Sequence, residues 1–250
     1  MDDGDLARTL AQAAGAALRE LQSVSGMPDG DRALRDLGDR AGQATLARLL
    51  AEHRPDDRVL SEEAKDDPAR LSARRVWIID PLDGTREFSE RRDDWAVHVA
   101  LWQDGDLVAG AVALPGLGIT LGADDPARSW PEPYPLRIAV SRSRATPLII
   151  AIADEIGAEL VPMGSAGYKA CAVVRGEVDA YLHTGGQYEW DSAAPVAVAR
   201  AAGLHVSRVD GSPLRYNQPD PYLPDLMICN PNLAEDLIGR ARTHLESESR

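Results

Sequence analysis

The expected fold is organised around one stretch, Trp77-Ile78-Ile79-Asp80-Pro81-Leu82-Asp83-Gly84-Thr85. The apolar run Val76–Ile79 predicts a buried strand, and Pro81 biases Asp80 away from helical geometry, so we expect the strand to end at Asp80 in a turn. Asp80 and Asp83 are thereby held near each other. Hard divalent cations such as Mg²⁺ favour an anionic, oxygen-rich corner of this kind. The stretch therefore predicts a cation site at the end of a strand.

The composition of the 250 residues is that of a globular chain and argues against two classes of partner. The 44% of hydrophobic residues is enough for a sizeable core, and the length fits one large domain or two modest ones. A formal net charge of -13 argues against a nucleic-acid duplex or an anionic membrane surface as partner. Small anionic substrates remain compatible, because bound divalent ions invert the field at one site.

Neither the cysteines nor the first residues indicate a secreted or membrane protein. Cys171 and Cys229 show no metal-ligand spacing and no disulfide framework, so we expect two buried, reduced thiols. Residues 1–20 lack an apolar signal core, and no run approaches the roughly 20 apolar residues of a membrane span. We therefore expect a cytoplasmic protein.

Periodicity predicts alternating helices and strands before residue 122. The expected elements are a helix over 5–22, a loop over 25–31, a helix over about 40–53, strands over 59–60 and 76–79, and a hairpin of 95–102 with 107–114. Asp39 precedes the second helix, where as an N-cap it would accept a backbone N–H. His98 lies inside a strand, where we expect a satisfied sheet residue rather than a ligand.

A proline-rich stretch, 122–135, is the expected linker between a first domain, 1–134, and a second, 135–250. The expected later elements are strands over 136–140, 160–162, 178–183, 204–206 and 226–229, and helices over 147–157, 168–174, 192–202 and from about 231, with a loop at 185–186. Strands that alternate with helices predict a layered α/β architecture.

Further acids could complete the corner at Asp80 and Asp83. Glu62 and Glu63 follow an earlier strand, and Asp191 lies at the start of a later helix. A phosphate-ester hydrolase that uses two or three Mg²⁺ ions needs several clustered carboxylates and an activated water. Each of these acids alone is also compatible with a solvated surface charge, and Asp191 with a helix N-cap.

The joint pattern is more specific than its parts. Ser61-Glu62-Glu63, the stretch from Asp80 to Thr85, and Trp190-Asp191-Ser192-Ala193-Ala194 together resemble the inositol monophosphatase superfamily. This resemblance covers residues 35 to 205 and implies a Mg²⁺-dependent, Li⁺-sensitive phosphatase. The implied fold is the α/β sugar-phosphatase fold, in alternating helix and sheet layers (αβαβα).

The resemblance also implies roles for site residues. The implied ligands of two or three Mg²⁺ ions are the carboxylates of Glu62, Asp80, Asp83 and Asp191 and the carbonyl group of Leu82. Thr85 would position the attacking water with an upstream aspartate, and Glu62 is also expected to be catalytic. The family's Val-Thr-x-Ala-Asp run is replaced by Arg35-Asp36-Leu37-Gly38-Asp39, so Asp39 is the first candidate and Asp36 stays open. The implied reaction is in-line attack by activated water without a covalent phosphoenzyme.

Two motifs of the second half are Ala139-Val140-Ser141-Arg142-Ser143, after a strand, and Gly164-Ser165-Ala166-Gly167-Tyr168-Lys169. They most resemble the CysQ-type 3′(2′),5′-bisphosphate nucleotidases of this superfamily. This implies conversion of 3′-phosphoadenosine 5′-phosphate, and of its 5′-phosphosulfate analogue, by loss of the 3′-phosphate, with a role in sulfate assimilation. The implied substrate contacts are Gly84, Thr85, Ser141, Arg142, Ser143, Gly164, Ser165, Lys169, His183 and Asp191. Lys169 would suit a phosphate remote from the metals.

Two other functions stay open. The same metal chemistry could act on inositol 1-phosphate or fructose 1,6-bisphosphate; His183 stands where inositol-cleaving relatives tend to carry an acid, which favours the nucleotide. A catalytically silent sensor of metal and nucleotide is the alternative from another class, and the intact set of acids argues against it. The oligomeric state stays open between monomer and homodimer, because family members occur as both.

Overall fold

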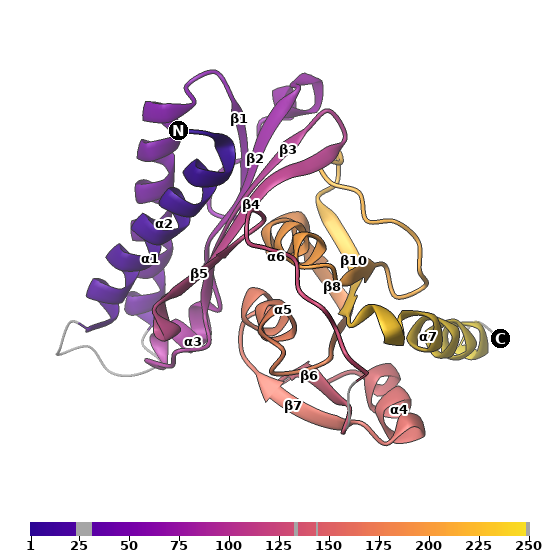
Figure 1. The fold of residues 1–250 in the computed structure, drawn as a ribbon. Coiled ribbons are helices and arrows are strands. Elements are labelled where there is room, and N and C mark those ends of the chain that lie inside the picture. Colours follow the sequence, from indigo (N-terminus) through magenta and orange to yellow (C-terminus); the bar gives the residue numbers. More distant parts are fainter. Residues whose placement is uncertain (24–31, 133–134, 144, 249–250) are drawn as a thin grey trace.

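The computed structural model of the chain describes residues 1–23, 32–132, 135–143 and 145–248. The loop expected at 25–31 lies outside these residues, as do two residues of the expected linker, 133 and 134. The elements stack in five layers, in the order helix, sheet, helix, sheet, helix, which confirms the expected α/β class and αβαβα layering (Figure 1). Among the described helices, none combines the length and the apolar composition needed to cross a bilayer.

The helices form three layers around two sheets. Their bounds are α1 (Asp3–Ser23), α2 (Arg32–His53), α3 (Thr85–Ser89), α4 (Pro147–Ile156), α5 (Ala166–Arg175), α6 (Glu189–Ala201) and α7 (Ala234–Glu248). α1 and α2 cover the outer face of the first sheet, α5 and α6 lie between the sheets, and α4 and α7 cover the outer face of the second (Figure 1). Both sheets are therefore buried on both faces, which explains the nearly continuous apolar runs of their strands.

The first sheet has the strand order β1-β2-β3-β4-β5. Its strands are β1 (Arg58–Ser61), β2 (Arg75–Asp83), β3 (Ala96–Gln103), β4 (Asp106–Leu114) and β5 (Ile119–Gly122). β1 and β2 are parallel, and the other neighbours are antiparallel. Side chains of β2 alternate between two cores, because Trp77 packs toward α1 and α2 whereas Ile78 packs toward α5 and α6. The periodicity does not predict β5, because four residues are too few to show an alternation.

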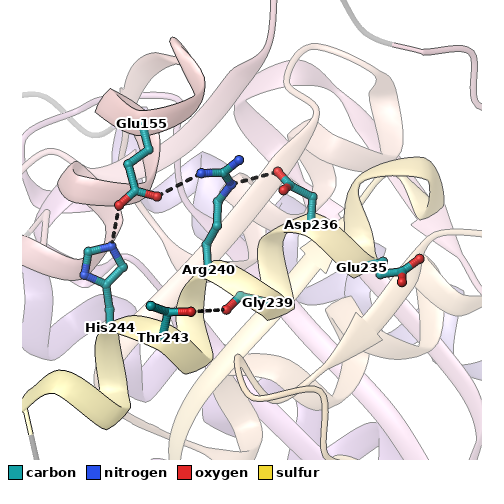
Figure 2. A pocket seen from close by; sticks show the side chains of 7 residues that line it. All are labelled: Glu155, Glu235, Asp236, Gly239, Arg240, Thr243 and His244. Atoms are coloured by element: carbon teal, nitrogen blue, oxygen red, sulfur yellow. Dashed lines mark hydrogen bonds and ion pairs between the residues drawn. The ribbon is translucent and has the colours of Figure 1, made fainter.

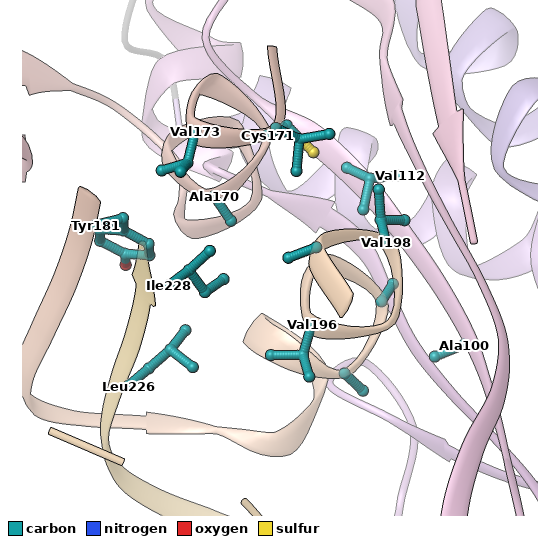
Figure 3. Packing of buried hydrophobic residues seen from close by; sticks show 14 of the residues in the cluster. Ala100, Val112, Ala170, Cys171, Val173, Tyr181, Val196, Val198, Leu226 and Ile228 are labelled. Atoms are coloured by element: carbon teal, nitrogen blue, oxygen red, sulfur yellow. The ribbon is translucent and has the colours of Figure 1, made fainter. Parts of the chain in front are cut away.

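The second sheet has the strand order β7-β6-β8-β10-β9. Its strands are β6 (Arg137–Ser141), β7 (Glu159–Met163), β8 (Ala180–Tyr188), β9 (His205–Ser207) and β10 (Tyr222–Cys229). Figure 3 shows the core between the sheets, where Val173 of α5 and Val196 of α6 approach Ile228 of β10. Cys171 in this core and Cys229 are buried and free, as expected.

The strand that carries the acidic stretch is longer than expected. β2 does not end at Asp80 but continues through Pro81 to Asp83, with a register shift against β3 between the two aspartates. The prediction that the strand ends before Pro81 is therefore wrong. Proline is tolerated at such an irregularity because its missing N–H removes no regular ladder hydrogen bond. Both carboxylates consequently lie on one ordered strand end.

Helix α2 also begins earlier than expected. It starts at Arg32 rather than near Arg40, so Asp39 lies inside the helix and the N-cap interpretation is wrong. Gly38 and Gly42 lower the helix propensity of this stretch, but they let α2 lie close to the end of β2. A Cβ at position 42 would lie 2.8 Å from the carbonyl oxygen of Pro81.

The glycine pair before Asp191 belongs to a strand rather than to a loop. β8 runs through Gly185 and Gly186, whose φ angles of +109° and +88° are easily adopted only by glycine. α6 then begins at Glu189, earlier than expected. Asp191 therefore lies in the first turn of α6 and is not its N-cap.

Candidate active site

Three aspartates that are distant in sequence come together at one place in the fold. Asp80 and Asp83 lie at the end of β2, and Asp191 lies in the first turn of α6. One carboxylate oxygen of each lies within 4.8 Å of the others. Asp80 and Asp83 are buried, and Asp191 is half-buried. Clustered carboxylate oxygens are the ligands that hard divalent cations prefer, so these three residues, here called the carboxylate cluster, form a candidate metal centre.

Asp80 has an electrostatic environment that lacks a positive partner. Its Oδ1 accepts a hydrogen bond from the backbone N–H of Leu82 at 2.9 Å, whereas its buried Oδ2 receives none from any residue that the structure describes. Burial, followed by the charges of Glu62 and Asp83, raises the pKa of Asp80 well above its usual range. A bound cation would supply the missing partner, so the residues present fit a metal ion.

Asp83 has the opposite environment, although it lies on the same strand end. Burial by itself would raise the pKa of Asp83, but the His98 ring, the Ser165 hydroxyl and the Gly167 N–H lower it to about 2. The Gly167 N–H donates to Asp83 Oδ2 at 2.6 Å, and His98 Nε2 lies 3.2 Å from the same oxygen. The carboxylate therefore stays ionised and ties β2 to the N-terminus of α5, where an anion is favourable.

Glu62 and Asp191 complete an acidic rim whose carboxyl groups hold their protons up to higher pH than usual. Glu62 lies beyond the end of β1, outside the carboxylate cluster but within hydrogen-bonding reach of Asp80. Partial burial of its carboxyl and the neighbouring charge of Asp191 raise the pKa of Glu62 to about 7, although much of the side chain is exposed. Burial and the charge of Asp83 raise the pKa of Asp191 to about 6. A cation would displace protons from these groups near neutral pH.

Thr85 lies between the carboxylate cluster and α2. Its hydroxyl donates to the Leu82 carbonyl oxygen at 3.3 Å and lies close enough to the Asp39 carboxyl group to oppose the rise of its pKa. Burial raises the pKa of Asp39 to about 6, and the charges of Glu63 and Asp36 add to the rise. Of the two candidate partners for Thr85, Asp39 is the one beside it, whereas Asp36 is exposed on α2.

Gly84 lets the chain turn from β2 into α3. Its φ of +91° lies in the left-handed region. A Cβ at this position would lie 3.1 Å from that of Ser165 and 3.2 Å from that of Trp95. The first N–H groups of α3 have no carbonyl partner within the helix, so they can donate hydrogen bonds to an anion. They follow Asp83 in the chain and therefore lie beside the carboxylate cluster.

The predicted substrate loop before α5 is held by internal contacts. The Ser165 hydroxyl donates to Asp83 Oδ2 and accepts the Tyr168 N–H at 3.0 Å. Lys169 is buried, and its Nζ donates to the carbonyl oxygens of Gly164 at 2.8 Å and Ser165 at 2.6 Å. These contacts hold the loop against Asp83, and a contact between Lys169 and a second phosphate stays a prediction.

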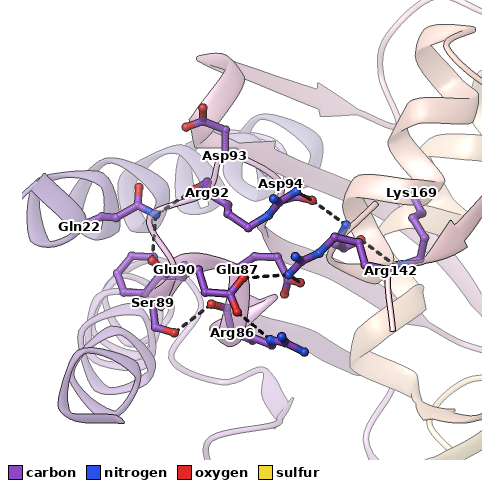
Figure 4. A network of polar contacts seen from close by, with 12 residues as sticks. Gln22, Arg86, Glu87, Ser89, Glu90, Arg92, Asp93, Asp94, Arg142 and Lys169 are labelled. Carbon is purple, nitrogen blue, oxygen red and sulfur yellow. Dashed lines mark hydrogen bonds and ion pairs between the residues drawn. The ribbon is translucent and has the colours of Figure 1, made fainter. Parts of the chain in front are cut away.

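Arg142, which follows β6, connects the two halves of the chain. Its Nη2 donates to Glu87 at 2.5 Å and to Glu90 at 3.0 Å, both on or next to α3 (Figure 4). Nearby, Asp94 accepts the Gly164 N–H at 2.7 Å. The guanidinium predicted to bind substrate is therefore paired with two carboxylates in this structure, and its contact with a phosphate stays a prediction.

The remaining predicted contacts lie at or near strand ends of the second sheet. Ser141 ends β6, and Ser143 is exposed just beyond it. His183 lies in β8, where its Nδ1 is 3.3 Å from the Tyr181 hydroxyl and its Nε2 is 3.0 Å from the Gly186 carbonyl oxygen. The structure does not bring these three side chains into the carboxylate cluster, and their roles stay predictions.

The sequence patterns do not predict the part that His98 plays in the site. His98 is a buried sheet residue, but it links two elements: its Nε2 contacts Asp83, and its Nδ1 lies 3.0 Å from the Trp190 carbonyl oxygen. A Cβ at Gly167 would lie 1.9 Å from His98 Nε2, so only glycine fits there. The hairpin signal could not reveal this, because it pairs His98 with Val112, whereas the register that places His98 opposite Asp80 joins β3 to β2.

A separate pocket of about 350 Å³ lies between α4 and α7 (Figure 2). It is lined by Glu155, Glu235, Asp236, Gly239, Arg240, Thr243 and His244. Glu155 pairs with Arg240 and with His244, each at 2.9 Å, so its charge is satisfied within the pocket. None of the carboxylate-cluster residues lines it, and we assign no chemistry to it.

Both the sequence and the fold have known relatives. The model of the inositol monophosphatase family matches residues 5–146 and 126–246. A 3′-phosphoadenosine 5′-phosphate phosphatase of Mycobacterium leprae is 52% identical over 97% of this chain and 94% of its own. The 3′(2′),5′-bisphosphate nucleotidase CysQ of Escherichia coli is 33% identical over 68% of this chain and 74% of its own. The structure of CysQ from Bacteroides thetaiotaomicron is similar with a TM-score of 0.76 and 26% identity, covering 92% of this chain and 97% of that one.

Proposed function

The chain belongs to the inositol monophosphatase family, and we propose that it converts 3′-phosphoadenosine 5′-phosphate and water to AMP and phosphate. The relative that is 52% identical over nearly the whole chain supports this substrate. The observation that carries the reaction class is the carboxylate cluster, with its three oxygens within 4.8 Å. The 5′-phosphosulfate analogue carries the same 3′-phosphate and belongs to the proposal, as does a role in sulfate assimilation.

The proposed cofactor is Mg²⁺, as two or three ions. The groups that would hold it are the carboxylates of Glu62, Asp80, Asp83 and Asp191 and the carbonyl group of Leu82. When bound, such ions polarise the phosphoryl group and acidify a water molecule. The unpartnered Oδ2 of Asp80, and the raised pKa values of Glu62 and Asp191, support this assignment.

The chain's own groups orient the water and the phosphate. When the Thr85 hydroxyl donates to Asp39 instead of the Leu82 carbonyl group, its oxygen accepts a hydrogen bond from the attacking water. The pKa of Asp39, about 6, suits a group that takes up a proton near neutral pH. The N–H groups of Gly84 and Thr85 would bind the phosphoryl oxygens, on which negative charge builds up during in-line attack.

Phosphate release from a panel of esters tests the proposal. We expect Mg²⁺-dependent release, with kcat/KM higher for the adenosine bisphosphate than for inositol 1-phosphate or fructose 1,6-bisphosphate. A clear preference for either sugar phosphate would overturn the substrate. Nucleotide binding without any release in Mg²⁺ would instead favour the silent sensor.

Inhibition by Li⁺ is an independent expectation of the metal chemistry. Li⁺ should lower phosphate release by competing with Mg²⁺, and Na⁺ at the same concentration is the matched control. Equal effects of the two ions would argue against a competition for the metal site.

A further inference from the structure

Two exposed aromatic side chains lie side by side at strand ends, and one of them, Tyr188, lies three residues before Asp191 of the carboxylate cluster. Tyr188 and Tyr222 are the only aromatic residues of the described part that are exposed, with 46% and 49% of their surface open to solvent. They come from β8 and β10, where they are direct cross-strand partners. Exposed aromatic surface gains no burial energy on folding, so two such side chains paired on one surface point to a ligand.

The rings form an ordered surface rather than two separate side chains. The ring of Tyr188 stacks on that of Trp190, with centroids 4.8 Å apart and planes 10° from parallel. Tyr222 meets Tyr188 edge to face, at 6.0 Å and 80°. The backbone beneath Tyr222 is bare, because a Cβ at Gly186 would lie 2.3 Å from the Tyr222 hydroxyl oxygen. We call Tyr188, Trp190 and Tyr222 the aromatic platform.

Backbone contacts fix the aromatic platform to the carboxylate cluster. The Tyr188 N–H donates to Asp191 Oδ2 at 2.6 Å. The Trp190 carbonyl oxygen lies 3.0 Å from His98 Nδ1, and the Nε2 of the same ring lies 3.2 Å from Asp83. The platform is therefore held to two of the three aspartates through one hydrogen bond or one imidazole ring.

We propose that the aromatic platform stacks against the adenine base of the substrate while the 3′-phosphate lies at the carboxylate cluster. This rests on the proposed function, since it needs a nucleotide with its scissile phosphate at that site. An uncharged, planar base suits an uncharged aromatic surface beside a strongly acidic cluster. Inositol and hexose phosphates have no π-face to stack, so the platform would favour nucleotides over them.

Binding of AMP and of ribose 5-phosphate, which differ by the base, tests the platform without turnover. Dissociation constants are measured with Mg²⁺ present for wild type, Tyr188→Leu, Tyr222→Leu and Tyr188→Phe, and thermal unfolding confirms that each variant folds. The leucine variants should bind AMP about 5- to 100-fold more weakly, and their preference for AMP over ribose 5-phosphate should fall. Tyr188→Phe keeps the ring and should retain most of that preference.

A matched control and two outcomes separate this proposal from the reaction itself. Ile150→Ala removes an exposed apolar side chain of α4 and should leave the preference for AMP unchanged. If the leucine variants keep the wild-type ratio of the dissociation constants for AMP and ribose 5-phosphate, the stacking role of the aromatic platform is wrong, even if the enzyme releases phosphate from the bisphosphate. Loss of the ratio in a protein that releases no phosphate would support the platform and overturn the proposed function.

Discussion

Asp80 and Asp83 lie three positions apart on β2, yet their pKa values shift in opposite directions. The difference comes from their neighbours: Asp80 faces other carboxyls, whereas Asp83 faces His98 and the N-terminus of α5. The spacing of the two aspartates along the sequence predicts that both lie near a cation. It does not predict that their pKa values shift in opposite directions. Asp80 is destabilising until a cation binds, and Asp83 is also a structural link.

Substitution of Asp80 should separate stability from activity. In Asp80→Asn we expect loss of Mg²⁺-dependent phosphate release together with a free energy of unfolding about 1–3 kcal/mol higher without metal, because a buried like charge is removed. Asp83→Asn is the matched variant and should lower both activity and stability, since it weakens the contacts with His98 and Gly167. Both are measured by denaturant unfolding in EDTA at pH 8. An Asp80→Asn protein less stable than wild type would contradict this division.

The raised pKa values also predict how stability and metal binding depend on pH. Glu62, Asp191 and Asp39 have folded pKa values of about 7, 6 and 6, above the value of about 4 expected in the unfolded chain. The folded state thus binds more protons between pH 4 and 7, so these groups make the free energy of unfolding of the metal-free protein fall as pH rises through that window. Mg²⁺ binding at pH 6.5 should release protons. Calorimetry in buffers of different ionisation enthalpy detects the released protons. Identical heats of Mg²⁺ binding in all buffers would contradict the raised pKa values.

At the scale of elements, close backbone packing positions the site. α2 lies against the end of β2 because Gly42 has no side chain, and α2 carries Asp39 to Thr85. The apolar periods of both elements could be read from the sequence, but their contact could not. The same glycines explain why α2 begins earlier than its sequence predicts: Gly38 and Gly42 permit tertiary packing but look locally like a helix boundary.

Alanine at Gly42 should therefore disturb the site through a helix movement. Its Cβ would lie 2.8 Å from the Pro81 carbonyl oxygen, so we expect kcat to fall about 10-fold or more, as for other misplacements of catalytic groups. Gly239→Ala in α7 is the control, because no atom lies within 4 Å of that added Cβ. It should stabilise the protein by about 0.5–1 kcal/mol through helix propensity. Equal kinetic effects of the two variants would show that α2 packing does not position the site.

At the scale of the whole molecule, the carboxylate cluster joins segments on both sides of the expected linker. Asp80 and Asp83 belong to the first sheet, whereas Asp191 lies in the first turn of α6, which packs between the sheets. The alternation of helix and strand signals predicts a layered α/β architecture, and the resemblance to the inositol monophosphatase superfamily adds the expectation of five layers. The position of Asp191 relative to Asp83 depends on long-range contacts such as that between His98 and Trp190, which no local pattern contains. The division of the chain into 1–134 and 135–250 stays a proposal.

A cation that binds across the two halves should stabilise the whole chain. We expect Mg²⁺ to raise the melting temperature, with a gain of about 2.7 kcal/mol at one hundred times its dissociation constant. Asp191→Asn should reduce this gain, because it removes the ligand supplied by the second half, whereas Asp154→Asn on the exposed face of α4 should keep it. Scanning calorimetry with and without Mg²⁺ measures the shift. A full Mg²⁺ shift in Asp191→Asn would remove this residue from the metal centre.

The central claim is that the carboxylate cluster performs Mg²⁺-dependent removal of the 3′-phosphate from an adenosine bisphosphate. The most direct measurement compares kcat/KM for 3′-phosphoadenosine 5′-phosphate and inositol 1-phosphate in wild type and Asp80→Asn, with Mg²⁺ and with EDTA. We predict rapid release from the bisphosphate in wild type with Mg²⁺, weaker release from inositol 1-phosphate, and none from either ester in Asp80→Asn or in EDTA. Release that persists in EDTA or in Asp80→Asn, or that favours inositol 1-phosphate, would contradict it.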